Sequence, residues 1–498
     1  MGVLRRSGMT ASYIFFGRLS TVVFNLVIVV LITRYLGRMA FGQYAFVESY
    51  ALVLSTLAAG GSTNILIREA AKNRARAGHA LGTAVELHAV FAVIAIGVGA
   101  LILRFLTTDP EVTRWVWISY FGTVVQVYCN LFAFIYVAFE DTRYWALTTA
   151  LERCIYLLLV LWVILSGHSL AAIFWMKSIS FGLVLLINVL IVQKRFVRVA
   201  WGSSLRESLF FVRESLPLAA SDTLLTLDRQ MDVLLLQLWS TPAQVGTFSA
   251  PYKIIDRLII LPNSVMSGFL PALSQLQATD RARLRELYRR IFKFFLLLSV
   301  PIAVIVSSLA GPIVLLLFTQ EYSSSVPILR IVAWIVPCMF LAYLFKDILT
   351  VIGRQRFDSV SRTFSVGLHL LLGWLLISNL GAMGAAVATL CAQVFLLLLG
   401  YIWISRQLGA YRPYRLLGKL AFVSLLVLGV SRAMSGVSLA ISLPLAVGIY
   451  VVGYLALRVM DPDEMQAIRT LLPIPGRKQA YVASAMPAGT TDMGPPGE

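Results

Sequence analysis

Charged side chains recur inside the long apolar stretches of this sequence, and they are the residues that could act on an ionic cargo. Arg18 and Glu48 lie in the first two such stretches, and Arg229, Lys253 and Arg257 lie in later ones. A charge near the centre of a bilayer costs at least about 2.5 kcal/mol, so a charged side chain there generally faces a partner or a cavity. The density of these groups predicts a water-filled interior.

Helical spacing predicts which of these side chains share one face. A single polar stripe is formed by Ser249, Lys253, Asp256, Asn263 and Ser267, which follow one another at steps of 4, 3, 7 and 4 residues. We expect this stripe to line the interior. The alternative is that Lys253 and Asp256 only neutralise each other and hold helices together.

Four carboxylates are candidates for binding a coupling ion, namely Asp222, Asp228, Asp232 and Asp256. A carboxylate removed from water can take up a proton near neutral pH, so each could bind a proton or a sodium ion. Arg229 lies three residues before Asp232, a spacing that allows an ion pair on one helix. Static pairing is therefore the alternative for this set. For His369, we favour simple packing over a proton relay.

The elements that must position these residues follow from the composition. Of the 498 residues, 59% are hydrophobic and 13% charged, and the mean hydropathy is +0.82. These values exclude a soluble enzyme, a disulfide scaffold and a disordered chain, and they indicate an all-α polytopic membrane protein. The net charge of +18 is attributed to basic cytoplasmic loops rather than to nucleic-acid binding. The four cysteines lack metal or disulfide spacing, and we expect no metal and no cofactor.

Apolar runs of spanning length predict about 14 transmembrane helices. Placing both termini in the cytoplasm puts most of the connectors' Lys and Arg residues inside, as the positive-inside rule requires. The predicted helices fall at residues 12–32, 41–62, 85–103, 115–138, 147–166 and 169–192, then at 210–238, 245–275, 294–318, 326–351, 358–379 and 382–404, and finally at 416–433 and 439–457.

An internal repeat relates the two sets of six helices. The residues from Phe41 to Ala45 match those from Val245 to Ser249, and each string opens the second helix of its set. Such duplication is typical of transporters with two lobes around a central site. We therefore expect two pseudo-symmetric six-helix lobes around a central cavity, at residues 1–200 and 201–408. Two further helices at 409–460 and a disordered cytoplasmic tail at 461–498 complete the prediction.

Several strings resemble a known family. They are TRYLGRMAFGQYAF and GGSTNILIREAAKNR within residues 33–74, DRQMDVLLLQLWSTPAQVGTFSAPYKIIDR at the start of 228–276, AGPIVLLLFTQEYSSSVPILRIVAW at 310–334, and GAMGAAVATLCAQV at 381–394. Their order and spacing are similar to the polysaccharide transporter branch of the multidrug/oligosaccharidyl-lipid/polysaccharide exporter superfamily. The resemblance covers residues 10 to about 405.

This resemblance implies a flippase that moves an undecaprenyl-diphosphate-linked oligosaccharide across a bacterial plasma (inner) membrane, for O-antigen, capsule or exopolysaccharide synthesis. Fixed cations would replace the hydration of the diphosphate during the crossing. Arg18, Arg229, Lys253 and Arg257 are then the diphosphate-attracting set, with Glu48 and Asn263 as further substrate contacts. Membrane lipid, and a polysaccharide polymerase, are the expected partners.

Three alternatives follow from the same features. A drug or cation exporter and a lipid II flippase share the superfamily, and a fold alone does not choose the cargo. A polytopic glycan polymerase or ligase is less favoured, because the predicted outside loops are short and contain no cluster of His with carboxylates. We therefore expect a transporter and not an enzyme.

Overall fold

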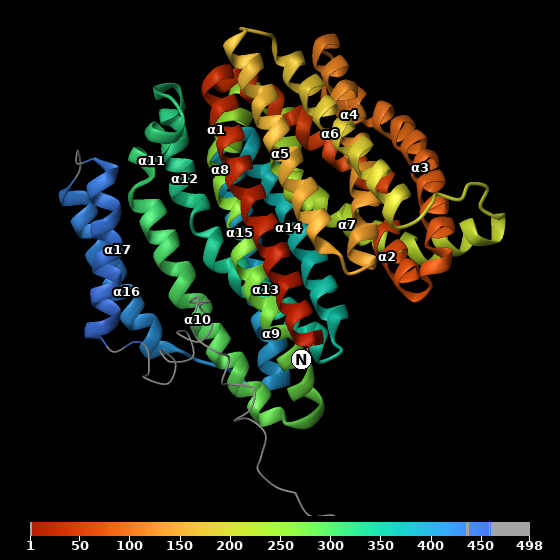
Figure 1. The fold of residues 1–498 in the computed structure, drawn as a ribbon. Helices are drawn as coiled ribbons and strands as arrows, with labels where there is room; N and C mark the ends of the chain where they lie inside the picture. The colour runs from red at the N-terminus through yellow and green to blue at the C-terminus, as the bar shows by residue number, and fades with distance from the viewer. Residues whose placement is uncertain (1, 435–437, 458, 460–498) are drawn as a thin grey trace, which may run out of the picture.

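The computed structural model describes residues 2–434, 438–457 and 459, with side chains from residue 21 onward. The described residues form helices and no strand, so the predicted all-α class is confirmed (Figure 1). The predicted tail at 461–498 lies outside the described residues. The helices are α1 (Gly2–Ala59), α2 (Ser62–Lys72), η1 (Arg74–Arg76), α3 (Ala77–Leu106), α4 (Pro110–Ala138), α5 (Thr142–Leu165), α6 (Leu170–Arg195), α7 (Leu205–Trp239), α8 (Pro242–Arg257), α9 (Ile260–Thr279), α10 (Arg281–Ser308), α11 (Ala310–Leu317), η2 (Gln320–Ser325), α12 (Val326–Val332), α13 (Ile335–Val351), α14 (Gln355–Leu380), α15 (Ala382–Leu408), α16 (Tyr414–Ala433) and α17 (Leu439–Ala456).

Eleven helical segments of the described chain are long and apolar enough to cross a membrane, or up to twelve if the bent pair α12 and α13 is one span. This confirms a multi-pass membrane protein, while the count of 14 stays a prediction. Two predicted spans, 12–32 and 41–62, belong to the single element α1. They are separated by a kink at Gly37, whose φ of 71° favours glycine.

Prolines interrupt the spans of the second half. The predicted span 245–275 is divided into α8 and α9, and the break falls just before Pro262. Proline has no N–H to donate to the carbonyl four residues earlier, and its ring crowds that carbonyl. The carbonyl of Leu258 accepts instead from the N–H of Leu261 at 3.1 Å. The predicted span 326–351 is likewise bent by 41° between α12 and α13.

The two repeat-related glycines, Gly42 and Gly246, meet where α1 crosses α8. A Cβ atom added to Gly42 would lie 1.7 Å from the carbonyl oxygen of Pro242 and 2.9 Å from the backbone nitrogen of Gly246. A Cβ on Gly246 would lie 2.1 Å from the carbonyl oxygen of Arg38. The two backbones therefore approach at a distance that only glycine allows. We call this end of the bundle the Gly42 end.

Hydrogen bonds fasten α1 to η2 at the Gly42 end. The backbone N–H of Arg38 donates to the Glu321 carboxylate at 2.9 Å, and its guanidinium donates to the Ser324 hydroxyl at 3.1 Å. Nearby, Nε of Arg34 donates to the carbonyl of Leu317 at 3.0 Å. The segments joined here are almost 300 residues apart in sequence, so this contact closes the bundle between its first and second halves.

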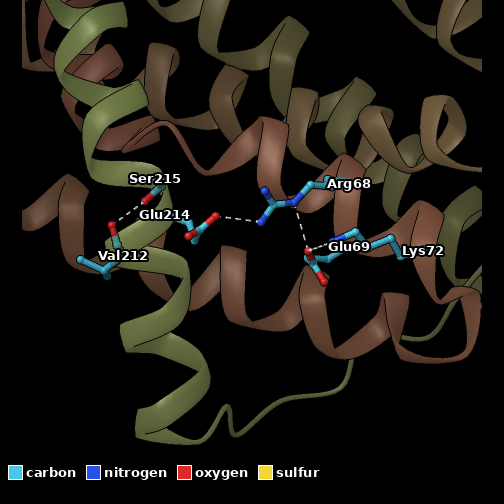
Figure 2. A network of polar contacts seen from close by, with 6 residues as sticks. All are labelled: Arg68, Glu69, Lys72, Val212, Glu214 and Ser215. Carbon is cyan, nitrogen blue, oxygen red and sulfur yellow. Dashed lines mark hydrogen bonds and ion pairs between the residues drawn. The ribbon is translucent and has the colours of Figure 1, made fainter.

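At the other end, α2 packs on α7, and we call this the Gly61 end. A Cβ on Gly61 would lie 2.4 Å from the backbone nitrogen of Ala219 in α7. Figure 2 shows the polar contacts beside this packing: Nη2 of Arg68 lies 3.1 Å from the Glu214 carboxylate, and Glu69 accepts from both Arg68 and Lys72. The side chains of Arg68 and Glu214 are about two-fifths exposed, so water screens this pair and its stabilisation is small.

The helix α7 touches elements from both halves of the sequence. It packs on α1, α2 and α3, and also on α8, α14 and α15. Its first turn is fixed by a capping box, in which the Ser204 side chain accepts from the backbone of Glu207 and the Glu207 carboxylate accepts from the backbone of Ser204. These hydrogen bonds hold the pKa of Glu207 below its usual value.

The last two helices form a pair beside α10, and Figure 1 shows α16 and α17 at the edge of the molecule that lies away from α3. The hydroxyls of Ser424 in α16 and Tyr450 in α17 are 2.9 Å apart, and Tyr454 donates to the carbonyl of Leu297 in α10 at 3.1 Å. The pair therefore adds to the outside of the bundle and supplies no residue to the ionic clusters described next.

Candidate functional site

A largely buried ionic cluster joins α1, α4 and α6. Glu48 forms an ion pair with Lys177, and the Ser119 hydroxyl donates to its other carboxylate oxygen at 2.7 Å. The side chains of Glu48 and Lys177 are 16% and 12% exposed. Glu48 was a predicted substrate contact, but Lys177 neutralises it in this conformation.

Lys253 lies against α1 from the opposite half of the sequence. Its ammonium group is 5.8 Å from the ring centre of Phe41 and 5.4 Å from that of Tyr44. A cation over an aromatic face is stabilised by the ring quadrupole. The sequence-based alternative of a Lys253–Asp256 pair is wrong, because no ion pair joins these two side chains in the described structure. Both residues lie on α8, but the ammonium group of Lys253 contacts the aromatic rings of α1.

Two further basic side chains lie near Lys253. Lys177 from α6 and Arg257, one turn further along α8, both lie within electrostatic range of its ammonium group, as do Glu48 and Asp256. Arg257 also lies within electrostatic range of Tyr44. We call Lys177, Lys253 and Arg257 the basic centre. Together with Glu48 and Asp256, these three side chains carry one net positive charge, which favours an anionic ligand.

A second buried cluster joins α7, α14 and α15. The Asp232 carboxylate lies 3.0 Å from Nε2 of His369 and accepts a hydrogen bond from the Thr389 hydroxyl at 2.9 Å. The other ring nitrogen of His369 is 3.6 Å from Asp228. The alternative of a static Arg229–Asp232 pair is not found among the described ion pairs: Asp232 contacts α14 and α15, while Arg229 donates to the Tyr343 hydroxyl of α13 at 3.4 Å.

The remaining predicted residues are dispersed. Asp222 and Asn263 are exposed, and Asp256 is partly buried. Asn263 lies in α9, beyond the break after α8, so the predicted stripe is divided between two helices. The backbone of Arg18 belongs to α1, but its side chain lies outside the described residues. The structure thus brings together Glu48, Lys253 and Arg257, whereas Arg229, on α7, contacts Tyr343 of α13 instead.

Three residues of these clusters were not predicted as site residues: Lys177 was only one of the charges in the apolar spans, His369 was interpreted as a packed side chain, and Thr389 gave no signal. Lys177 is 129 residues from Glu48, and His369 is 137 residues from Asp232. Helical periodicity relates only residues on one helix, so it gives no signal for such pairs. The sequence shows that Lys177 is a charged residue in an apolar span, but it does not show which residue pairs with it.

The Glu48–Lys177 pair should be strongly coupled. Replacing either residue alone, by Glu48→Gln or Lys177→Met, leaves a buried charge unpaired, which we expect to destabilise the protein by about 3 kcal/mol. The double variant should recover much of that loss. Unfolding of the purified protein, analysed as a double-mutant cycle, measures the coupling. The exposed Arg290–Glu286 pair of α10 is the control, with an expected coupling below about 0.5 kcal/mol; equal values for both pairs would contradict this prediction.

Comparison with known proteins adds two family matches. The model of a family described as polysaccharide biosynthesis protein matches residues 8–277. The model of a second family, MatE, matches residues 217–375. No curated protein sequence matches the chain.

Several solved structures are similar to the chain in fold. The lipid II flippase MurJ, in an inward closed conformation, has a TM-score of 0.73 and 14% identity, over 90% of this chain and 98% of that one. An inward-facing multidrug resistance MATE family transporter of the MOP superfamily has a TM-score of 0.65 and 13% identity, over 79% and 98%. A Vibrio cholerae MATE transporter has a TM-score of 0.57 and 16% identity, over 81% and 96%. These likenesses establish the fold.

Proposed function

The chain belongs to the polysaccharide biosynthesis protein family, and from this premise we propose that it is a flippase for an undecaprenyl-diphosphate-linked oligosaccharide. The family match confirms the resemblance to the polysaccharide branch of the exporter superfamily. The observation that carries the proposal is the basic centre, in which Lys177, Lys253 and Arg257 converge from α6 and α8.

The basic centre fits the chemistry of a diphosphate. The anionic group must leave one headgroup region, and fixed cations replace the water that it loses. The polyprenyl chain stays in lipid between two lobes at residues 1–200 and 201–408, and the sugars occupy the wet interior. Arg229 extends the basic path along α7, Arg18 remains a predicted diphosphate contact, and Glu48 and Asn263 contact sugar hydroxyls.

The closed Gly42 end supports alternating access. In the proposed topology both termini are cytoplasmic, the protein lies in the bacterial inner membrane, and the Gly42 end faces outward. The contact of Gly42 with Gly246 then seals the outer side, while the partly exposed Arg68–Glu214 contact at the inner side is weak enough to open.

A lipid II flippase is the second candidate. It is favoured by the similarity in fold to MurJ, whose cargo is named in its description. Both candidates require the same chemistry at the basic centre, because lipid II and the repeat-unit carrier share a lipid-linked diphosphate. Their sugars differ, so the two functions are distinguished by which surface glycan depends on the protein.

Deletion of the gene tests the proposal. We expect loss of a surface polysaccharide, with lipid-linked repeat units accumulating in the inner leaflet, and restoration by the plasmid-borne chain. Rescue of cells depleted of their lipid II flippase would instead support the second candidate. Increased sensitivity to cationic dyes, with surface glycans intact, would refute both and indicate a drug exporter.

A further inference from the structure

A cavity of about 370 Å³ lies where α6 ends and the connector to α7 begins. It is lined by Gln193, Lys194, Arg198 and Val199, and we call it the Lys194 cavity. Its volume falls within the range of small-ligand pockets. Lys194 follows Lys177 on the same helix by 194 − 177 = 17 residues, which is about 25 Å along the helix axis. The Lys194 cavity is therefore distinct from the basic centre.

The Lys194 cavity carries two positive charges and an amide donor. No ion pair among the described residues involves Lys194 or Arg198. Arg195, which lies between them in sequence, instead donates to the Tyr144 hydroxyl, and its guanidinium is 5.7 Å from the centre of that ring. The Gln193 amide adds a neutral N–H donor. Two cations and an amide fit a phosphate group, whose oxygens accept several hydrogen bonds.

An apolar stripe on α6 leads to the Lys194 cavity. It consists of Ile179, Leu183, Leu186 and Leu190, which follow one another at steps of 4, 3 and 4 residues and are 43%, 47%, 57% and 46% exposed. Lys194 continues this face, four residues after Leu190. Because α6 is long and apolar enough to span a membrane, exposed apolar side chains on it face the acyl chains of lipids. A lipid that lies along the stripe has its headgroup at the level of the cavity.

We propose that the Lys194 cavity binds the phosphate of an anionic glycerophospholipid, which stays in the membrane and is not transported. Basic pockets at the cytoplasmic ends of spans recognise such headgroups, and in the proposed topology this end of α6 is cytoplasmic. Trp201 of the same connector is 65% exposed, as is common for tryptophan at a membrane interface. The positive-inside rule accounts for basic residues on a connector, but it requires neither a cavity nor an aligned apolar stripe.

Contacts with α3 fix the backbone from which Arg198 extends, and Figure 1 shows the connector beside this helix. A Cβ on Gly78 would lie 2.2 Å from the carbonyl oxygen of Arg198. The N–H of Ala200 donates to the carbonyl of Gly78 at 3.2 Å, and the N–H of Gly202 donates to the Glu86 carboxylate at 2.8 Å. Because the connector is already ordered, less conformational entropy is lost when Arg198 binds a phosphate.

Native mass spectrometry of the full-length protein tests the inference with no cargo present. The protein in detergent is titrated with dioleoyl phosphatidylglycerol or with dioleoyl phosphatidylcholine, which has the same acyl chains and no net charge. We expect the first phosphatidylglycerol molecule to bind more tightly than the first phosphatidylcholine. The double variant Lys194→Gln, Arg198→Gln should weaken the first phosphatidylglycerol about thirtyfold, because each cation near an anionic lipid contributes about a factor of five.

A matched double variant removes the same charge elsewhere. Arg354 and Arg356 are exposed, lie at the start of α14 and do not line the cavity. Arg354→Gln, Arg356→Gln should therefore bind phosphatidylglycerol like the parent protein. Equal melting temperatures in lipid-free detergent verify that both double variants are folded, as expected for exposed side chains. An equal loss of binding in the two, or no loss in the Lys194 and Arg198 variant, would overturn the inference.

A third variant tests whether the acyl chain contributes. Leu190→Gln keeps both cations of the Lys194 cavity and interrupts the apolar stripe next to it, so it should weaken phosphatidylglycerol severalfold. Ammonium phosphate at millimolar concentration should not displace the lipid, because a free anion makes no contact with the stripe. Displacement by phosphate, together with unchanged binding in Leu190→Gln, would show that the cavity takes a free anion and would overturn the lipid assignment.

The lipid site and the proposed function fail separately, because no oligosaccharide-linked lipid is present in these titrations. Loss of a surface polysaccharide on gene deletion, without selective binding of phosphatidylglycerol at the Lys194 cavity, would refute only the lipid site. Selective binding at the cavity, without any dependence of surface glycans on the protein, would refute only the flippase.

Discussion

Lys253→Met should reduce polysaccharide export by about ten- to a hundredfold while leaving protein in the membrane. The methionine keeps the packing over Phe41 and Tyr44 and removes only the charge. A hydrogen bond to a charged group contributes about 1.5–3 kcal/mol, which sets the expected size of the loss. Lys253→Arg keeps the charge and should retain part of the export. Surface glycan in the complemented deletion strain, normalised to the protein in membranes, measures both.

Lys346 provides the matched control for Lys253. Its ammonium group also lies over an aromatic ring, at 5.4 Å from the centre of Tyr343, but its side chain is exposed and outside the basic centre. Lys346→Met should therefore leave export close to that of the parent protein. Unchanged export in Lys253→Met, or an equal loss in both variants, would remove Lys253 from the diphosphate site.

Gly42→Ala should prevent the bundle from closing at the Gly42 end. The added methyl group would lie 1.7 Å from the Pro242 carbonyl oxygen, so α1 and α8 must separate. Overpacking of this kind costs about 1–3 kcal/mol or more, all of it in the closed state. Because about 1.4 kcal/mol changes an equilibrium constant tenfold, we expect export to fall at least tenfold. A cysteine at the buried position Ser249 should become reactive to a membrane-impermeant maleimide.

Gly268→Ala separates this effect from the general effect of alanine in a helix. A Cβ on Gly268 meets no atom within 4 Å, and both substitutions raise helix propensity equally. The control should export normally and keep Ser249→Cys unreactive. Gly246→Ala should behave like Gly42→Ala, because the two glycines face each other. Normal export in both repeat-related variants would show that the close crossing is not required.

The position of the breaks was partly predictable. The prolines of α8 and α9 are visible in the sequence, yet Pro251 and Pro271 lie inside helices, whereas the interruption falls at residues 258–259, before Pro262. The kink at Gly37 was hidden for a different reason. Its φ is positive, and a Cβ at Gly37 would lie 2.8 Å from the carboxylate of Glu321, which comes from the other half of the chain and accepts from the N–H of Arg38.

The all-α membrane class, the charges within the spans and the repeated glycine motif can all be read from the amino-acid order. Composition and local periodicity act within one helix, so they identify these features without a partner. The packing of the helices is needed to show that Lys253 lies over the rings of α1, that Glu48 meets Lys177, and that Asp232 meets His369. Those choices depend on how helices cross, and the crossing of α1 and α8 is set by backbone contact between Gly42 and Gly246, which no spacing along the chain encodes.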